Sequence, residues 1–121
     1  MGDRGNIAII QSNDDQVWLY SHWGGYELPD RLRQGIIAGK GRWGDESYLA
    51  KIIIGHAVPA DNWLEETGYG ISCRMQDNEH PINVVDITGQ RIYTMDQDKL
   101  EDGRVPKGYE PAKFTKFEDV K

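Results

Sequence analysis

Two short β-branched runs, separated by a turn, limit the folds that this chain can adopt more than any other feature of its sequence. Residues 6–12 and 16–22 are apolar or β-branched at most positions, and the turn residues SNDD separate them. A connection this short joins antiparallel strands, so the N-terminal part is predicted to form a β-hairpin. Because side chains alternate along a strand, Trp18, Tyr20 and His22 are expected on one face.

Three more runs predict strands nearer the C-terminus. Residues 82–87 and 90–95 are joined by Thr88-Gly89, and a glycine-containing two-residue link between such runs is typical of a hairpin. The run GISCRM at 70–75 precedes them and predicts a separate strand. The sequence therefore indicates about five strands in total.

Two helical patterns lie between these groups of strands. The first covers 28–37, where Pro29 suits the opening turn and leucine and isoleucine recur every four residues. The second begins near Asp45, where acidic residues favour the positive end of the helix dipole, and it runs to His56. Glycines follow the first pattern and are expected to end it.

This order of elements, ββααβββ, predicts an α+β fold. We expect a two-layer sandwich in which a mostly antiparallel sheet of about five strands carries two helices on one face. The other face, and an edge strand at 90–95, are expected to stay partly open to water or to a partner. Residues 1–95 are predicted to form this domain, and 96–121 a polar C-terminal extension that docks through Tyr109, Phe114 and Phe117.

The composition restricts the classes of function. The formal net charge of −6 argues against a protein that binds duplex nucleic acid by neutralising phosphates. No apolar run approaches the roughly 20 residues that a bilayer span requires. Cys73 is the one cysteine, so no internal disulfide can form and a cytoplasmic location is expected. A sheet with two edges can also pair with the sheet of a second copy, so a homo-oligomer is a further possibility.

The stretch SHWGG links a predicted strand to the first predicted helix. His22 and Trp23 end the strand, and Gly24 and Gly25 allow another backbone or a ligand to approach closely. The start of the following helix presents unpaired backbone N–H groups, which favour an anion. These four residues, the first glycine corner, are therefore a candidate ligand site.

A second glycine corner, GKGRWGDESY at 39–48, leads into the second predicted helix. Arg42 can fork onto a phosphate and Trp43 can stack a base, with Tyr48 close behind them. If the two corners meet, they line a hollow that suits a small anionic or nucleotide-like ligand. The alternative is that both are structural, with glycines shaping the turns and tryptophans closing the core.

Catalytic and metal-binding patterns are weak. No histidine, cysteine and carboxylate spacing matches a metal site, and no cofactor motif is present. His22 beside two glycines motivates one enzymatic alternative, a small hydrolase with this residue as general base. His56 and His80 are expected to be structural. We therefore assign no catalytic residue, no metal ligand and no cofactor.

Several short motifs together resemble a known group of proteins. The motifs HWGG, GRW-x-DE-x-YLA-x-I and ETGYGIS lie within a similarity that covers roughly residues 5–95. The group comprises uncharacterised small proteins of actinobacteria and their bacteriophages. The resemblance implies a cytoplasmic accessory protein of a phage or a bacterium, and it carries no activity or site residue.

Two hypotheses of different classes follow. The leading one is a non-enzymatic binding module for a small anionic or nucleotide-like ligand, and it depends on the two glycine corners. The second is a protein-interaction or inhibitor module that engages a host protein through the open sheet face or a sheet edge. The observation that tests the leading hypothesis is whether Trp23, Arg42 and Trp43 converge on one hollow.

Overall fold

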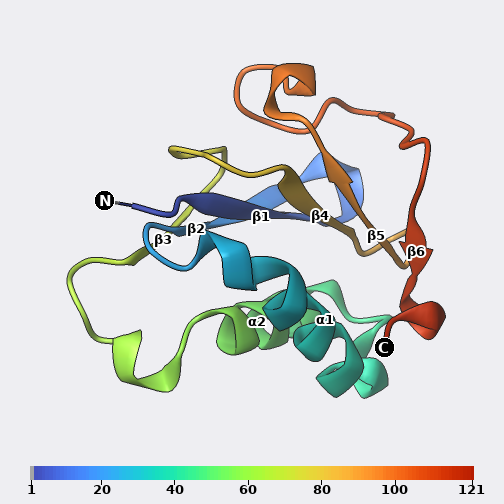
Figure 1. The fold of residues 1–121 in the computed structure, drawn as a ribbon. Helices are drawn as coiled ribbons and strands as arrows, with labels where there is room; N and C mark the ends of the chain where they lie inside the picture. The colour runs from blue at the N-terminus through green and yellow to red at the C-terminus, as the bar shows by residue number, and fades with distance from the viewer. Residues whose placement is uncertain (1) are drawn as a thin grey trace.

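Six strands form one sheet in the computed structural model, which describes residues 2–121 (Figure 1). The order across the sheet is β3-β2-β1-β4-β5-β6. The strands are β1 (Gly5–Ile10), β2 (Gln16–Ser21), β3 (Tyr69–Ser72), β4 (Ile82–Asp86), β5 (Arg91–Met95) and β6 (Thr115–Lys116). The α+β class predicted from the sequence is confirmed, with one strand more than expected.

The two predicted hairpins are present. β1 pairs antiparallel with β2, with Ile7 opposite Leu19, and β4 pairs antiparallel with β5, with Asp86 opposite Arg91. These pairs join through short turns, so local sequence was sufficient to specify them. The expected antiparallel character holds for every pairing of the sheet except one, because β1 and β4 run parallel, with Ile7 opposite Asn83.

The parallel pairing follows from the path of the chain between β3 and β4. This segment crosses from the sheet edge to the centre, where Asn6 of β1 holds it by accepting a hydrogen bond from the Gln76 N–H at 3.3 Å. The Asn6 amide also donates to the Asp77 carbonyl at 2.8 Å. Asn6 is completely buried, so these bonds satisfy an amide that would otherwise be costly to bury. The crossing delivers β4 beside β1 and makes the sheet mixed.

Two α-helices cover one face of the sheet (Figure 1). They are α1 (Leu28–Ala38) and α2 (Glu46–Ala57). Asp45 caps α2 by accepting a hydrogen bond from the Tyr48 N–H at 3.2 Å. Gly35 allows the helices to approach closely, because a Cβ there would lie 3.0 Å from the Ile53 Cα atom. Within residues 2–121, neither α-helix has the length and apolar composition of a membrane span.

The helices and the sheet enclose the larger part of the core. Its members come from β1, β2, β4 and both helices, and the fully buried ones include Ile7, Ile9, Leu28, Ile36 and Ile53. Apolar residues of α1 recur every four positions on the side that faces the sheet, as the sequence pattern predicts.

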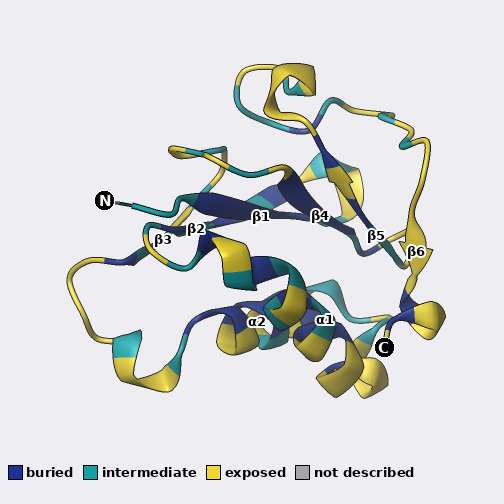
Figure 2. Ribbon diagram, viewed as in Figure 1, coloured by how far each residue is buried: buried dark blue, intermediate teal, exposed yellow. Residues whose placement is uncertain are grey.

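The opposite face of the sheet is covered, so the expectation of an open face is wrong. A second buried cluster lies there and consists of Ala8, Trp18, Ile82, Val84, Tyr93, Met95 and Val105 (Figure 2). Gln16 holds the covering segment, because its amide donates to the Val105 carbonyl at 2.8 Å and its Oε1 accepts from Trp18 Nε1 at 3.0 Å. The C-terminal segment was expected to dock through its aromatic residues, but its mostly polar composition does not indicate which face of the sheet it covers.

The segment 96–121 contributes to both sides of the sheet. β6 pairs antiparallel with β5, with Thr115 opposite Ile92. The sheet edge expected at 90–95 is therefore covered in part, because β6 pairs with Arg91 and Ile92 and leaves Tyr93, Thr94 and Met95 without a strand partner on that side among residues 2–121. Of the three aromatic residues expected to dock, Phe117 is buried in the helix-side core, Tyr109 stacks on Tyr93 and Phe114 stays half-exposed.

Candidate functional site

The first glycine corner begins where β2 ends. The Tyr20 hydroxyl and His22 Nδ1 share a hydrogen bond of 2.6 Å, and the His22 ring meets the Trp23 ring edge-on with centroids 4.9 Å apart. The Trp23 ring also lies over Gly68, the residue before β3. Tyr20 and His22 are therefore in contact, as their predicted common face allows, but with Trp23 they are engaged with one another and with the residue before β3.

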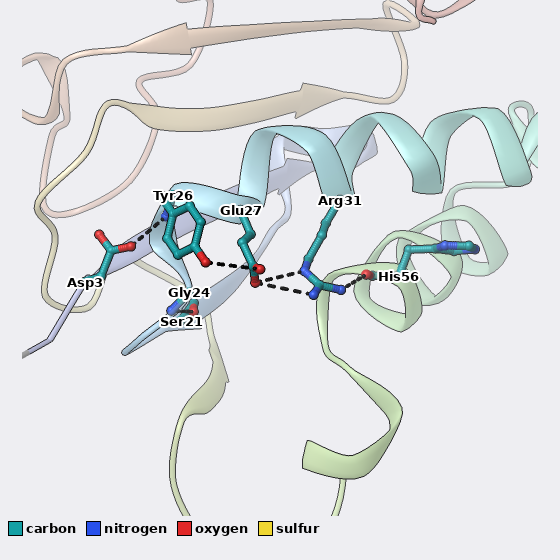
Figure 3. Close-up of polar contacts among 7 residues, drawn as sticks. All are labelled: Asp3, Ser21, Gly24, Tyr26, Glu27, Arg31 and His56. Atoms are coloured by element: carbon teal, nitrogen blue, oxygen red, sulfur yellow. Dashed lines mark hydrogen bonds and ion pairs between the residues drawn. The ribbon is translucent and has the colours of Figure 1, made fainter.

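The two glycines of this corner form hydrogen bonds within the protein, and Gly25 forms its bond with the N-terminal segment of the chain. The Gly25 N–H donates to the Asp3 carbonyl at 2.8 Å, and a Cβ at Gly25 would lie only 2.7 Å from that carbonyl oxygen. The Gly24 N–H donates to Ser21 Oγ at 3.0 Å (Figure 3). The close approach at Gly25 is thus to the protein's own backbone, whereas Gly24 faces the side chains of Ser21 and Tyr69.

The anion site expected at the start of the first helix is occupied by a carboxylate of the chain. Asp3 Oδ2 accepts a hydrogen bond from the Tyr26 N–H at 3.0 Å, just before α1 (Figure 3). Its Oδ1 is hydrogen-bonded to His80 Nε2. The His80 hydrogen bond, followed by that from Tyr26, lowers the pKa of the Asp3 carboxyl. An external anion would have to displace this carboxylate.

A short polar chain fastens α1 to α2 next to this corner. The Glu27 carboxylate lies 3.3 Å from the Arg31 guanidinium, which also donates to the His56 carbonyl at 3.5 Å (Figure 3). His56 therefore contributes its backbone oxygen to helix packing. Its imidazole takes part in no hydrogen bond or ion pair among residues 2–121.

The second glycine corner is also engaged in packing. Trp43 Nε1 donates to the Ile36 carbonyl near the end of α1 at 2.9 Å, and the Trp43 ring lies 5.4 Å from the ring of buried Phe117. The Arg42 guanidinium sits 4.6 Å from the centroid of the Tyr48 ring. These contacts anchor the α1–α2 connection to the C-terminal segment.

The two corners do not meet. One lies immediately before α1 and the other immediately after it, and this 11-residue helix separates them by about 16 Å. The expectation that Trp23, Arg42 and Trp43 converge on one hollow is therefore wrong. Helix α1 was predicted correctly, and its length alone is enough to keep the residues at its two ends apart.

A different hollow lies between α1 and the β5 side of the sheet, and we call it the α1–β5 cleft. It has a volume of about 270 Å³. Pro29 and Leu32 of α1 line one side, Asn83 and Thr94 line the sheet side, and Phe114 of the C-terminal segment contributes a further wall. The cleft exists because α1 and α2 pack over β1, β2 and β4 and leave the helix-facing side of β5 partly uncovered.

The α1–β5 cleft combines apolar walls with polar groups on the sheet. Asn83 and Thr94 are direct cross-strand partners. Asn83 is only 3% exposed, and its Nδ2 donates to the Asn6 carbonyl at 3.2 Å. Its Oδ1 accepts no hydrogen bond from the residues that the structure describes. This oxygen is not fully buried, so water can reach it, and in a cleft wall it is an acceptor that a ligand donor can use in place of water.

Two cations line the same cleft. Arg33 is ion-paired with the exposed carboxylate of Asp30 one turn earlier on α1. Lys113 is exposed, and none of the ion pairs between described residues involves it. The local charge is therefore positive although the whole chain carries −6.

Phe114 is held in the cleft wall by Arg91. The Arg91 guanidinium lies 5.1 Å from the Phe114 ring centroid, and it is ion-paired with Asp86 at 3.0 Å and with Glu110 at 3.4 Å. Burial is the largest single influence and lowers the pKa of Arg91, but the hydrogen bonds and charges of Glu110 and Asp86 together outweigh it, so the pKa is raised. On its other side Phe114 borders a second hollow of about 390 Å³ that Trp43 also lines.

No catalytic constellation emerges among residues 2–121. No three histidine, cysteine or acidic side chains within this range gather as a metal site requires. His22 contacts Tyr20, and His80 contacts Asp3. Comparison with known protein families, with curated proteins and with solved structures finds no match.

The residues of the α1–β5 cleft were missed by sequence reasoning. One signal was available, because Asn83 alternates onto the same face of its strand as Val85, where an apolar residue is expected. A polar residue on the core face of a strand marks a position that deserves a functional explanation. Lys113 and Phe114 carried no such signal, since they lie 30 residues further along the chain in a polar segment.

Proposed function

We propose that this protein is a non-enzymatic binding module for a small organic anion that also carries an apolar group and a hydrogen-bond donor. The site is the α1–β5 cleft rather than the glycine corners. The observation that carries the proposal is that Asn83, whose Oδ1 accepts no hydrogen bond from the described residues, lies in the wall of a cleft that Lys113 and Arg33 also line.

Each part of the ligand has a counterpart in the cleft. Lys113 and Arg33 favour a carboxylate or a phosphate. The Asn83 amide oxygen accepts a hydrogen bond from a hydroxyl or an amino group of the ligand, and Thr94 donates or accepts one. Pro29, Leu32 and Phe114 provide apolar contact. The volume, at the lower end of ordinary ligand sites, favours a small molecule.

The test measures the thermal shift of the full chain with three probes. Phenyllactate supplies a carboxylate, a hydroxyl and an aromatic ring, phenyllactamide is its neutral counterpart, and AMP represents nucleotides. Phenyllactate or AMP is expected to raise the melting temperature through binding to the native state, and phenyllactamide to have a smaller effect. No shift with any probe contradicts the proposal.

Three variants locate the site. Lys113→Gln is expected to weaken the anion's binding about fivefold, since an exposed charge interaction contributes up to about 1 kcal/mol. Lys51→Gln on exposed α2 surface is the matched control and is expected to leave binding unchanged. Arg42→Gln tests the second glycine corner. Loss of binding in Arg42→Gln with normal binding in Lys113→Gln would move the site to that corner and overturn the cleft proposal.

A further inference from the structure

The two edges of the sheet differ in how they are protected. β6 is a two-residue strand that contains Lys116 and is followed by a buried Phe117, so it offers little backbone for pairing, and beyond it only Tyr93, Thr94 and Met95 of β5 lack a strand partner on that side in the described part of the chain. β3 spans four residues, Tyr69–Ser72, pairs only with β2 and contains neither a charged residue nor proline. Short strands, lysine and proline are the usual protection against edge pairing, and β3 lacks the last two.

Exposed apolar side chains surround the β3 edge. Ile71 is 60% exposed although it lies on the helix-facing side of the sheet, opposite buried Leu19. A hollow of about 190 Å³ beside it is also lined by Trp63. Leu64, next in sequence to Trp63, is 99% exposed. Figure 2 shows the exposed stretch of chain that leads from α2 towards β3. Such a gathering is typical of a surface that another protein covers.

The charges at the two ends of β3 select an antiparallel partner of the same sequence. Glu65 and Glu66 precede the strand and Arg74 follows it, all three are exposed, and none takes part in an ion pair between described residues. When two identical strands pair antiparallel, the start of each lies beside the end of the other. The acidic end of one β3 would therefore lie beside the basic end of the second, whereas a parallel pairing would place like charges together.

The geometry of an antiparallel ladder restricts the register. Residue pairs alternate between hydrogen-bonded and non-hydrogen-bonded types, so a twofold axis must pass between a residue and its own copy. With Gly70 on the axis, Tyr69 faces Ile71 of the second copy and Glu66 lies towards its Arg74. Nothing lies within 4 Å of the position of a Cβ at Gly70, so space is open at the centre of the contact.

We infer that two copies of this chain associate through their β3 strands, in antiparallel pairing about a twofold axis, to form one continuous sheet. The helices of both copies then lie on the same side of that sheet, and Ile71 and Tyr69 pack across the axis. This interface is independent of the α1–β5 cleft, which lies near the opposite edge of the sheet.

The test is sedimentation velocity of the full chain from low micromolar to near-millimolar concentration. A reversible monomer–dimer equilibrium is expected. Ile71→Lys is expected to raise the dissociation constant at least about tenfold, the equivalent of about 1.4 kcal/mol. Ile37→Lys, on the exposed side of α1, replaces a similarly exposed isoleucine and is expected to leave the dissociation constant unchanged. A wild-type chain that stays monomeric throughout overturns the inference, and then a strand of another protein is the remaining occupant.

A charge exchange tests the antiparallel arrangement. Glu66→Arg and Arg74→Glu are each expected to weaken dimerisation, because each places like charges side by side, and the double variant is expected to restore it. All three variants are expected to keep the fold, which circular dichroism checks, since both side chains are exposed. Dimerisation that is equally weak in the double variant contradicts the antiparallel pairing.

Discussion

Asn83 of β4 lies directly opposite Thr94 of β5, on the side of the sheet that the helices cover. Asn83 is buried and Thr94 is exposed, so the edge of the helical layer passes between two neighbouring residues. An apolar pair at this point would extend the core outward. The polar pair instead marks the boundary between the core and the α1–β5 cleft. Substitutions of these two residues are therefore the most direct test of ligand binding in the cleft.

Replacement of Thr94 by valine removes the hydroxyl and keeps the shape of the side chain. We expect phenyllactate to bind about three- to tenfold more weakly, as for the loss of one neutral hydrogen bond. The free energy of unfolding is expected to change by less than about 0.5 kcal/mol, because Thr94 is exposed. Calorimetric titration measures the affinity, and Thr88→Val in the exposed β4–β5 turn is the control. Unchanged affinity in Thr94→Val would exclude its hydroxyl from the site.

Gly25→Ala is expected to destabilise the protein by about 1–3 kcal/mol, the usual cost of overpacking. The added methyl group would lie 2.7 Å from the Asp3 carbonyl oxygen and 2.8 Å from a ring carbon of His80. Gly55→Ala is the matched control, since nothing lies within 4 Å of the new methyl group in the interior of α2. The control is expected to stabilise the helix by up to about 1 kcal/mol. Urea denaturation measures both, and equal effects would refute the packing argument.

Phe117→Ala is expected to cost about 3–5 kcal/mol, because it empties a fully enclosed site between Trp43 and the helix-side core. Phe114→Ala, three residues earlier, truncates a side chain that is 48% exposed and is expected to cost less than about 1 kcal/mol. The comparison by chemical denaturation determines whether the C-terminal segment is part of the cooperative fold. Similar small losses in both variants would mean that this segment contributes little stability.

Tyr93 is expected to make the protein sensitive to alkaline pH. Burial raises the pKa of its hydroxyl from 10.0 to about 12, with a smaller contribution from the Asp86 carboxylate. The unfolded chain therefore releases this proton at lower pH than the native protein does. The stability that Tyr93 contributes is fully present below pH 10 and is lost as the pH rises towards 12, by roughly 2 kcal/mol.

The Tyr93→Phe variant isolates this effect from the other tyrosines. Its stability is expected to fall less than that of the wild-type protein between pH 10 and 12, whereas the two curves run parallel from pH 7 to 9. Urea denaturation at each pH provides the comparison. Curves that stay parallel up to pH 12 would show that Tyr93 titrates normally in the native state.

Much of the fold was predictable because it depends on contacts between near neighbours in sequence. The hairpins at 5–21 and 82–95 and the helices at 28–38 and 46–57 carry their signals in turn residues and in side-chain periodicity. The candidate site was not predictable in this way. The first glycine corner is a true strand-to-helix junction, but the group that occupies it is the carboxylate of Asp3, which lies 23 positions before Tyr26 in the chain.

The C-terminal segment shows most clearly what local sequence patterns cannot predict. A polar composition indicated an extension that docks on the surface, and Phe117 gave no sign that it would be enclosed by Trp43 and the helix-side core. Burial depends on which surfaces meet, and those surfaces come from residues more than 70 positions apart. Periodicity along one segment cannot encode such a contact.

Local sequence patterns predict both α-helices, the first five strands and their order, because backbone propensity and side-chain alternation act over a few residues. Only the tertiary structure decided that β1 and β4 run parallel, that the far face of the sheet is covered and that α1 holds the two glycine corners apart. It also brought Asn83, Thr94 and Lys113 to one cleft. These outcomes depend on how the packed surfaces fit in three dimensions. The packing energy comes from contacts between segments that are far apart in the sequence, so no single segment encodes it.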